Sequence, residues 1–229
     1  MADLKAEVAA LQQAPSESGC AGAAQRMKAL TEALRAPLDE ALTRTVLDTL
    51  RSQRCFQAMR TFAGEAAKLA QDGLLVYVQR QLAQARIELG DLGDAVTLLE
   101  DLARRLGPGP ARRDRSEVHG LTGRALKQRF VQGVAGGATG EEELRAAVQA
   151  YCRGYEVEYD PGWHGANIVA LVARAEREGF GAGTDSAAVW AQRLLAELQQ
   201  RARVSWGPWD YASAGEAYLA LDDKDNVAD

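Results

Sequence analysis

The chain has 229 residues, of which 47 % are hydrophobic, 26 % charged and only 6 % aromatic. Long stretches of Ala, Leu, Gln, Arg and Glu with few β-branched runs favour close-packed helices over a β-sandwich or barrel. The formal net charge of −5 repels a nucleic-acid backbone, so we do not expect nucleic acid as a partner. The amino terminus lacks an uninterrupted apolar segment, which predicts a cytoplasmic protein with no membrane partner.

The cysteine pattern gives no sign of a metal site. Cys20, Cys55 and Cys152 are odd in number and far apart, without the spacing of zinc ligands. We therefore expect buried or unreactive thiols, no disulfide framework, no metal and no cofactor.

Apolar residues at intervals of three and four predict helices from the amino terminus onward. We interpret residues 1–72 as divergent helical hairpins, with helices over Leu4–Leu11, Ala23–Leu34, Pro37–Leu50 and Cys55–Ala70. The clearest hairpin lies within residues 73–110. It has a helix from Leu74 to Leu89, a turn at Gly90 and Asp91, and a partner helix that ends before Gly107.

The second half of the chain continues the pattern. We expect the basic segment 111–116 to be a solvated connector, and Gln132–Gly140 to be a long mobile loop. Thr139 and Glu142 form a plausible capping box for the helix after that loop. Helices are predicted over Glu117–Val131, Leu144–Tyr155, His164–Glu178, Asp185–Arg203 and Trp209–Leu221. Within the C-terminal hairpins, residues 185–229, the last helix after Asp222 is too short to bury a face, so we expect the natural chain to continue.

Small residues recur twelve positions apart in successive helices. The pairs are Val46 with Ala58, Ala83 with Ala95, and Gly215 with Val227. Antiparallel helices need small side chains where their axes come closest, so one two-helix unit has been used repeatedly. The pattern predicts one all-α domain over residues 1–229, an α-α superhelix built as a solenoid of antiparallel hairpins. Gly123 and Ala147 are 24 positions apart, which predicts an insertion of about twelve residues in the Gln132–Gly140 loop.

Two stretches resemble the tetratricopeptide repeat, a helical hairpin of about 34 residues. The first is the run Leu82-Ala83, Gly90-Asp91, Ala95, Leu99 and Leu102, and the second is Tyr211, Gly215 and Tyr218.

A sharper resemblance covers residues 116–178. It rests on Glu117 to Arg124, Lys127, Tyr151 to Glu158, Pro161-Gly162 and Asn167. This segment resembles the TRAFs-binding domain of the apoptosis-signal-regulating kinases and similar segments of bacterial multidomain proteins. The resemblance implies a tetratricopeptide-type array that mediates protein contacts or holds a neighbouring effector domain in check.

In tetratricopeptide arrays the first helix of each hairpin lines the concave side. Alignment by the small residues assigns to that side Tyr77, Arg80, Gln84, Glu88, Arg124, Lys127, Gln128, His164, Asn167, Arg174, Trp209 and Glu216. Basic residues recur in this set, so we expect the partner to be an acidic peptide or protein, or another domain of the parent chain. The alternative is a solvated surface with scattered charges. Uncovered ends of the array would also permit self-association.

Enzymatic functions have less support. Neither His119 nor His164 has a nearby Ser or Cys at a spacing that suggests a nucleophile, and the Gly133–Gly140 stretch lacks the lysine of a phosphate loop. We predict a non-catalytic interaction or regulatory module. The alternatives are a small-ligand-binding or hydrolytic helical domain using His164 and Asn167, a passive spacer, and a ligand cage formed by the four tryptophans.

Overall fold

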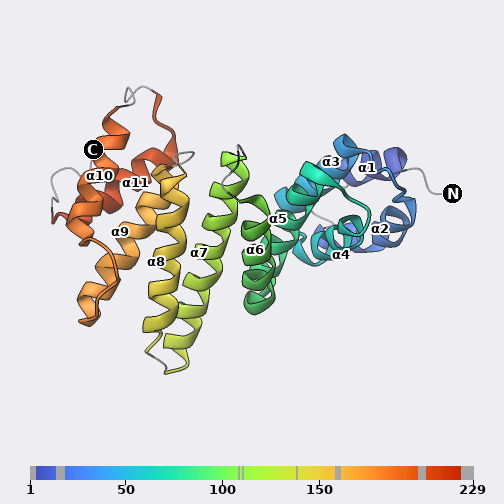
Figure 1. The fold of residues 1–229 in the computed structure, drawn as a ribbon. Helices are drawn as coiled ribbons and strands as arrows, with labels where there is room; N and C mark the ends of the chain where they lie inside the picture. The colour runs from blue at the N-terminus through green and yellow to red at the C-terminus, as the bar shows by residue number, and fades with distance from the viewer. Residues whose placement is uncertain are drawn as a thin grey trace. The chain divides into compact units, whose positions relative to one another are not determined.

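The computed structural model describes residues 4–13, 19–107, 109, 111–137, 139–157, 161–200 and 205–222 (Figure 1). Over these ranges the chain is helical with turns and bends between the helices, and it contains no strand. The predicted all-α fold class is therefore confirmed. The chain forms two compact units, unit 1 (Met1–Leu102) and unit 2 (Ala103–Asp229).

Unit 1 is built around α4 and α5. Its helices are α1 (Leu4–Gln13), α2 (Gly19–Ala33), α3 (Glu40–Ser52), α4 (Phe56–Ala67), α5 (Asp72–Leu89) and most of α6 (Leu92–Leu106). Helix α4 packs against α2, α3 and α5, and α1 packs against α2 and α3. Phe62, Met59 and Leu47 are fully buried in this core. Gly90, with φ of 84°, ends α5 in the left-handed conformation that glycine adopts readily.

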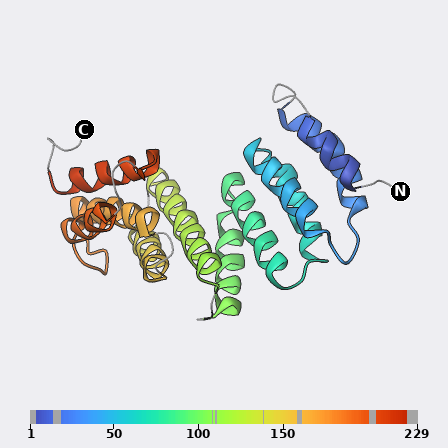
Figure 2. The ribbon, with the colours of Figure 1, turned by 90° about the horizontal axis from the view of Figure 1, so that it is seen from above.

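Unit 2 contains a long hairpin followed by three further helices. These are α7 (Arg112–Ala135), α8 (Glu141–Glu156), α9 (Pro161–Glu178), α10 (Ala187–Gln199) and α11 (Pro208–Ala220). Helices α7 and α8 lie side by side, α8 packs against α9, and α9 packs against α10. Helix α11 crosses α9 and α10 (Figure 2).

Three glycines let the helices of unit 2 approach closely. A Cβ atom on Gly120 would lie 2.1 Å from the Trp163 ring, and one on Gly154 would lie 2.3 Å from Cε1 of His164. On Gly123 it would lie 2.7 Å from the Tyr151 ring. Because real Cβ atoms cannot come that close, the rings occupy space that only glycine leaves open. These glycine notches on α7 and α8 fix where α9 sits, at Gly120 and Gly154, and how closely α8 approaches α7, at Gly123.

The loops of unit 2 differ from the expectation. Residues 112–116 form the first turns of α7 rather than a solvated connector, and residues 132–135 form its last turn. The extra residues between Gly123 and Ala147 therefore lengthen the two helices of the hairpin, and the turn between them is short. The predicted Thr139 capping box is also wrong, because Gly140 is the N-cap of α8. Repeated backbone hydrogen bonds along a packed helix outweigh the low helix propensity of Gly133.

A disulfide joins Cys20 at the start of α2 to Cys55 at the N-cap of α4. Their Cα atoms are 5.1 Å apart although 35 positions separate them in the chain. The expectation of free thiols is therefore wrong for this pair. It was wrong because the packing of α2 on α4 is a non-local property that the spacing of cysteines does not reveal.

The glycine notches give a direct test of unit 2. Gly154→Ala places a methyl group inside the His164 ring, so we expect a loss of about 2 to 3 kcal/mol in the free energy of unfolding, measured by urea denaturation. The matched control is Gly64→Ala in α4, where a Cβ meets nothing within 4 Å. Alanine there is expected to stabilise the helix by about 0.5 to 1 kcal/mol. Equal effects of the two changes would contradict the close approach at Gly154.

Candidate functional site

Unit 2 contains an open groove of about 720 Å³ between α7, α9 and α11, with α8 contributing to its floor. Its wall on α7 is cationic, its floor is aromatic and apolar, and its wall on α11 carries acidic and small side chains. The groove, called here the α7–α11 groove, is lined by Arg124, Lys127, Tyr151, Gly162, Trp163, Ala166, Asn167, Ala170, Trp209, Asp210, Ala212, Ser213 and Glu216.

In the cationic wall, Lys127 is held in place by a hydrogen bond to α9. Nζ of Lys127 donates to Oδ1 of Asn167 over 2.6 Å, and Nδ2 of Asn167 donates to the backbone oxygen of Trp163 over 2.9 Å. Burial lowers the pKa of Lys127 and the neighbouring Arg124 lowers it further, whereas Glu216 acts in the opposite direction. The hydrogen bond to Asn167 therefore positions the ammonium group of Lys127 before a partner binds.

The floor and the rim of the groove are aromatic. Tyr151 lies edge-on to Trp163, with ring centroids 6.2 Å apart, and only 1 % of Tyr151 is exposed. Burial raises the pKa of the Tyr151 hydroxyl, so it stays neutral at physiological pH. Trp209 at the start of α11 is 85 % exposed. A large indole ring left in solvent beside an apolar floor is typical of a binding surface.

The groove brings together three of the predicted site residues, Arg124, Lys127 and Asn167, with Trp209 and Glu216 opposite them. Gln128 and Arg174 do not line it. Arg174 instead pairs with Glu178 on α9 and lies 5.7 Å from the Phe130 ring centroid. Gln84 on α5 is half-buried and, like Tyr77 and Arg80, belongs to unit 1.

His164 is not a surface residue. Its side chain is fully buried, and Nε2 lies 2.8 Å from Oγ of Ser116 on α7. Its ring fills the notch at Gly154 and contacts Trp163 and Tyr151. The expectation that His164 meets a partner on the concave surface is therefore wrong. The His164 ring points into the space beside Gly154 on α8. The position of His164 along α9 does not by itself predict this burial.

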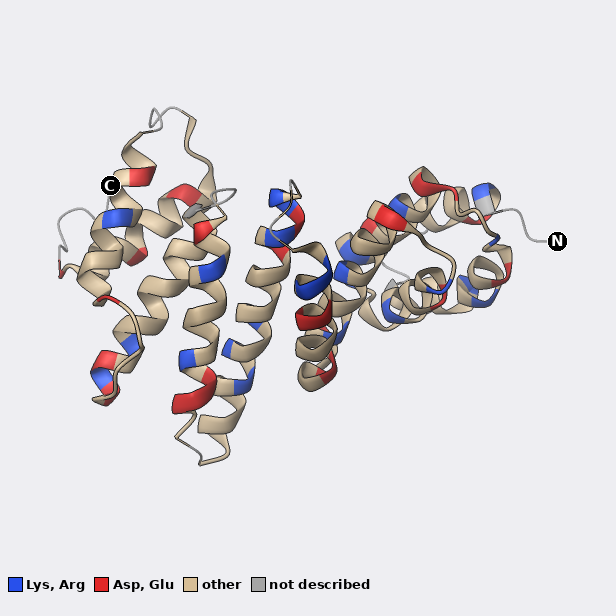
Figure 3. Cartoon of the chain, viewed as in Figure 1, with Lys and Arg blue, Asp and Glu red and all other residues tan. Residues whose placement is uncertain are grey.

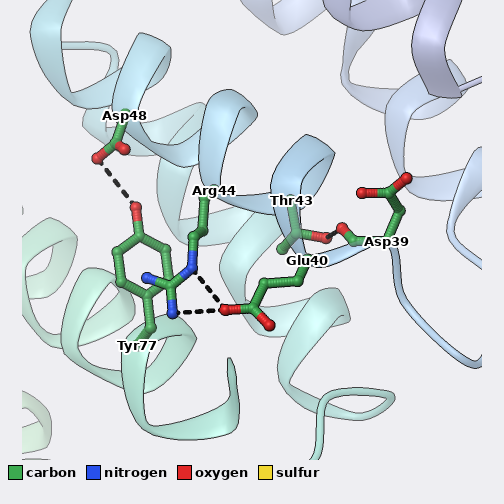
Figure 4. A network of polar contacts seen from close by, with 6 residues as sticks. All are labelled: Asp39, Glu40, Thr43, Arg44, Asp48 and Tyr77. Atoms are coloured by element: carbon green, nitrogen blue, oxygen red, sulfur yellow. Dashed lines mark hydrogen bonds and ion pairs between the residues drawn. The ribbon is translucent and has the colours of Figure 1, made fainter. Parts of the chain in front are cut away.

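Tyr77 belongs to a polar network between α3 and α5 (Figure 4). Its hydroxyl donates to Oδ1 of Asp48 over 2.9 Å, and the Arg44 guanidinium lies 4.1 Å from its ring centroid. Arg44 in turn pairs with Glu40 one turn away. Burial raises the pKa of Tyr77, and the hydrogen bond to Asp48 raises it further. Tyr77 and Arg80 are only 7 % and 8 % exposed, so they contribute to the stability of unit 1 more than to a surface.

Charges of both signs are spread over the helices of each unit (Figure 3). The acidic residues Glu141, Glu142 and Glu143 lie in the first turn of α8, where they complement the helix dipole. In the described part of the chain, no group of His, Cys, Asp and Glu side chains is arranged to hold a metal ion. None of the described helices combines the length and apolar character needed to cross a membrane.

The concave-side assignment left out the lining residues Tyr151, Trp163 and Ser213, and Trp163 entered only the alternative of a tryptophan cage. The missed signal was on α9, where Trp163, Ala166, Asn167 and Ala170 follow the spacing of one helical face. The four tryptophans do not form one cage. Trp163 and Trp209 line the groove, whereas Trp190 packs edge-on to Tyr155 and Trp206 packs against Tyr211.

Comparison with protein families gives one match relevant to this geometry. The family model described as Tetratricopeptide Repeats-Sensor matches residues 55–172, just over half of the chain. This range includes α7, α8 and most of α9. The match supports the tetratricopeptide-like repeat, whereas the resemblance to the TRAFs-binding domain stays a prediction.

Among solved structures, the chain is similar to the crystal structure of BtubC (BKLC) from P. vanneervenii. The two are 16 % identical with a TM-score of 0.51, and the match covers 98 % of this chain and 87 % of that one. At this identity the likeness shows the fold alone. None of the curated proteins matches the chain.

The network at Tyr77 predicts a stability effect. Tyr77→Phe removes the hydrogen bond to Asp48 while keeping the ring, so we expect a loss of about 1 kcal/mol in the free energy of unfolding. The control is Tyr211→Phe, at a residue that is 48 % exposed, which should change stability little. Denaturant melts of the two variants give the comparison, and indistinguishable midpoints would refute the role of the network.

His119 predicts a pH dependence of stability. Burial, followed by the charges of Arg153 and Arg115, lowers its pKa from 6.5 to about 4. The unfolded chain therefore takes up the proton first as the pH falls, and folding stability declines between pH 6.5 and pH 4. We expect His119→Asn to remove about 1 to 2 kcal/mol of that decline, because partial exposure screens part of the shift. Urea denaturation at pH 6.5 and at pH 4 measures the decline in the free energy of unfolding. An equal decline in His119→Asn and in the parent chain would contradict the role given to His119.

Proposed function

Because the chain belongs to the Tetratricopeptide Repeats-Sensor family, we propose that it is a non-catalytic recognition module whose α7–α11 groove receives a protein partner. The observation that carries this proposal is the combination of an exposed Trp209 with a preorganised cationic wall on one groove. A peptide segment of a partner protein, or of another domain of the parent chain, is the occupant that this surface fits.

Trp209 is the expected anchor. Tryptophan and arginine residues often contribute most of the binding free energy at protein interfaces. A large ring such as indole also removes much apolar surface from water when a partner covers it. Trp209 presents such a ring at the rim, and the floor below it is formed by Trp163, Ala166 and Ala170. A partner side chain inserted between Trp209 and Trp163 becomes buried on both sides.

The charges set the chemistry of the partner. Arg124 and Lys127 on α7 favour carboxylates, and the hydrogen bond from Lys127 to Asn167 reduces the entropy lost on binding. Glu216 faces them from α11 and repels an acidic group on its own side. We therefore propose a segment whose acidic residues lie along α7 and whose apolar or basic residues lie along α11.

A small organic ligand is the second candidate, because the groove volume of about 720 Å³ lies in the range of small-molecule sites. The hydrolytic version of this candidate has less support, because His164 and the Ser116 hydroxyl that it contacts are both buried. A ligand would compete with the peptide for the aromatic floor. If peptides bind in the groove and no metabolite displaces them, the result favours a protein partner over a small ligand.

The groove is tested with two variants. Arg124→Glu reverses a charge on the cationic wall, and Trp209→Ser removes the anchor from a site that contributes little to the core. A display library of random peptides is selected on the parent chain, and the affinities of the enriched peptides are measured by fluorescence polarisation. We expect enrichment of acidic peptides with apolar anchors, and each variant to weaken their binding by about tenfold or more.

The matched control is Arg177→Glu, the same change on an exposed arginine of α9 outside the groove. It should leave the affinity within about twofold of the parent, because exposed charges away from the site contribute little. The proposal fails if no peptide is enriched, or if Arg177→Glu weakens binding as much as Arg124→Glu.

A further inference from the structure

The disulfide of unit 1 connects two very different environments. Cys20 is the second residue of α2 and is exposed to solvent, whereas Cys55 is only 1 % exposed. Cys55 is also firmly held by its backbone, since its N–H donates to the oxygen of Leu50 and its own oxygen accepts from Met59. The link thus joins an exposed residue at one end to a residue fixed in the core at the other.

We propose that the Cys20–Cys55 disulfide is a thiol-reversible link that controls whether the start of α2 stays docked on unit 1. The site is a redox-modification site, and its co-reactant is a small thiol of the glutathione type. It is separate from the α7–α11 groove and does not depend on what that groove binds.

The start of α2 offers little apolar surface to the core. Its first two turns, residues 19–26, contain mainly Gly and Ala, and among residues 20–26, whose burial the structure describes, Ala23 is the buried one. The large buried side chains of the helix, Met27 and Leu30, come later. Arg26 pairs with Glu7 of α1 over 3.3 Å, but both side chains are partly exposed. A short apolar contact of this kind contributes little, so the covalent link carries much of the docking of these two turns.

The exchange proceeds in two balanced steps. A thiolate attacks Sγ of Cys20, the solvent-exposed residue of the pair, the S–S bond breaks, and Cys55 leaves as a thiolate that then takes up a proton. The leaving thiolate forms at the N-cap of α4, the position at which the first backbone N–H groups of a helix lack intrahelical partners and favour negative charge. A second thiol then attacks the mixed disulfide on Cys20. The chain gains two thiols, and two small thiols are oxidised to one disulfide.

Cys152 provides the contrast within the same chain. It is a free cysteine on α8 and is half-buried. Burial raises its pKa, which keeps it in the less reactive thiol form. Because Cys152 carries no disulfide bond, a reducing thiol changes the pair in unit 1 and leaves Cys152 unchanged.

The experiment uses the full chain in glutathione buffers of increasing reducing strength. Peptide mapping without reductant measures the Cys20–Cys55 cross-link, and hydrogen exchange measures opening of each helix. We expect the cross-link to disappear as reduced glutathione is added to the folded chain. Exchange in residues 19–26 should then become about tenfold faster or more, while α7, α8 and α9 stay unchanged.

Two variants separate this proposal from a general effect of reductant. Cys20→Ser should show fast exchange of residues 19–26 in every buffer, and Cys152→Ser should behave like the parent chain. Three outcomes overturn the proposal: two free thiols at these positions in the oxidised chain, a cross-link that resists glutathione while the chain is folded, or equal exchange of residues 19–26 in both redox states.

Discussion

The close approach of α7, α8 and α9 at the glycine notches is the constraint on which unit 2 depends. Gly120 and Gly154 leave space for the rings of Trp163 and His164, and Gly123 leaves space for Tyr151. The same contacts place Trp163 and Tyr151 at the floor of the α7–α11 groove. The buried pair of Ser116 and His164 then ties the start of α7 to α9, so packing and site geometry have one cause.

The helices could be predicted because their signal is local. Apolar residues at three- and four-residue intervals placed nearly every helix, and the small residues Ala83, Ala95 and Ala147 are indeed fully buried. Two features that depend on packing were not predicted. Residues 132–135 extend α7 despite a glycine-rich sequence, and the disulfide forms because α2 packs on α4, which no residue spacing encodes.

The site was partly predictable for a related reason. Arg124, Lys127 and Asn167, which the helix-face assignment placed on one side, line the same groove, because the residues of one face stay together when helices stack. The same assignment failed for His164 and for Tyr77. The helix face predicts the direction in which a side chain points. Which neighbouring residue covers that side chain depends on how the adjacent helices pack. At Tyr77 that neighbour is Arg44 of α3, and at His164 it is the notch at Gly154.

Helix α11 differs from the helices beneath it in how it is held. Its buried residues are Ala214 and Ala217, whereas Trp209, Tyr211 and Leu219 remain exposed. Burial of two methyl groups contributes far less than the Leu and Ile side chains that fix α9 and α10. Under the proposed function, an occupant that contacts Trp209 and Arg124 together bridges α11 and α7. Binding in the groove and docking of α11 would then be thermodynamically linked, so that each favours the other by the same free energy.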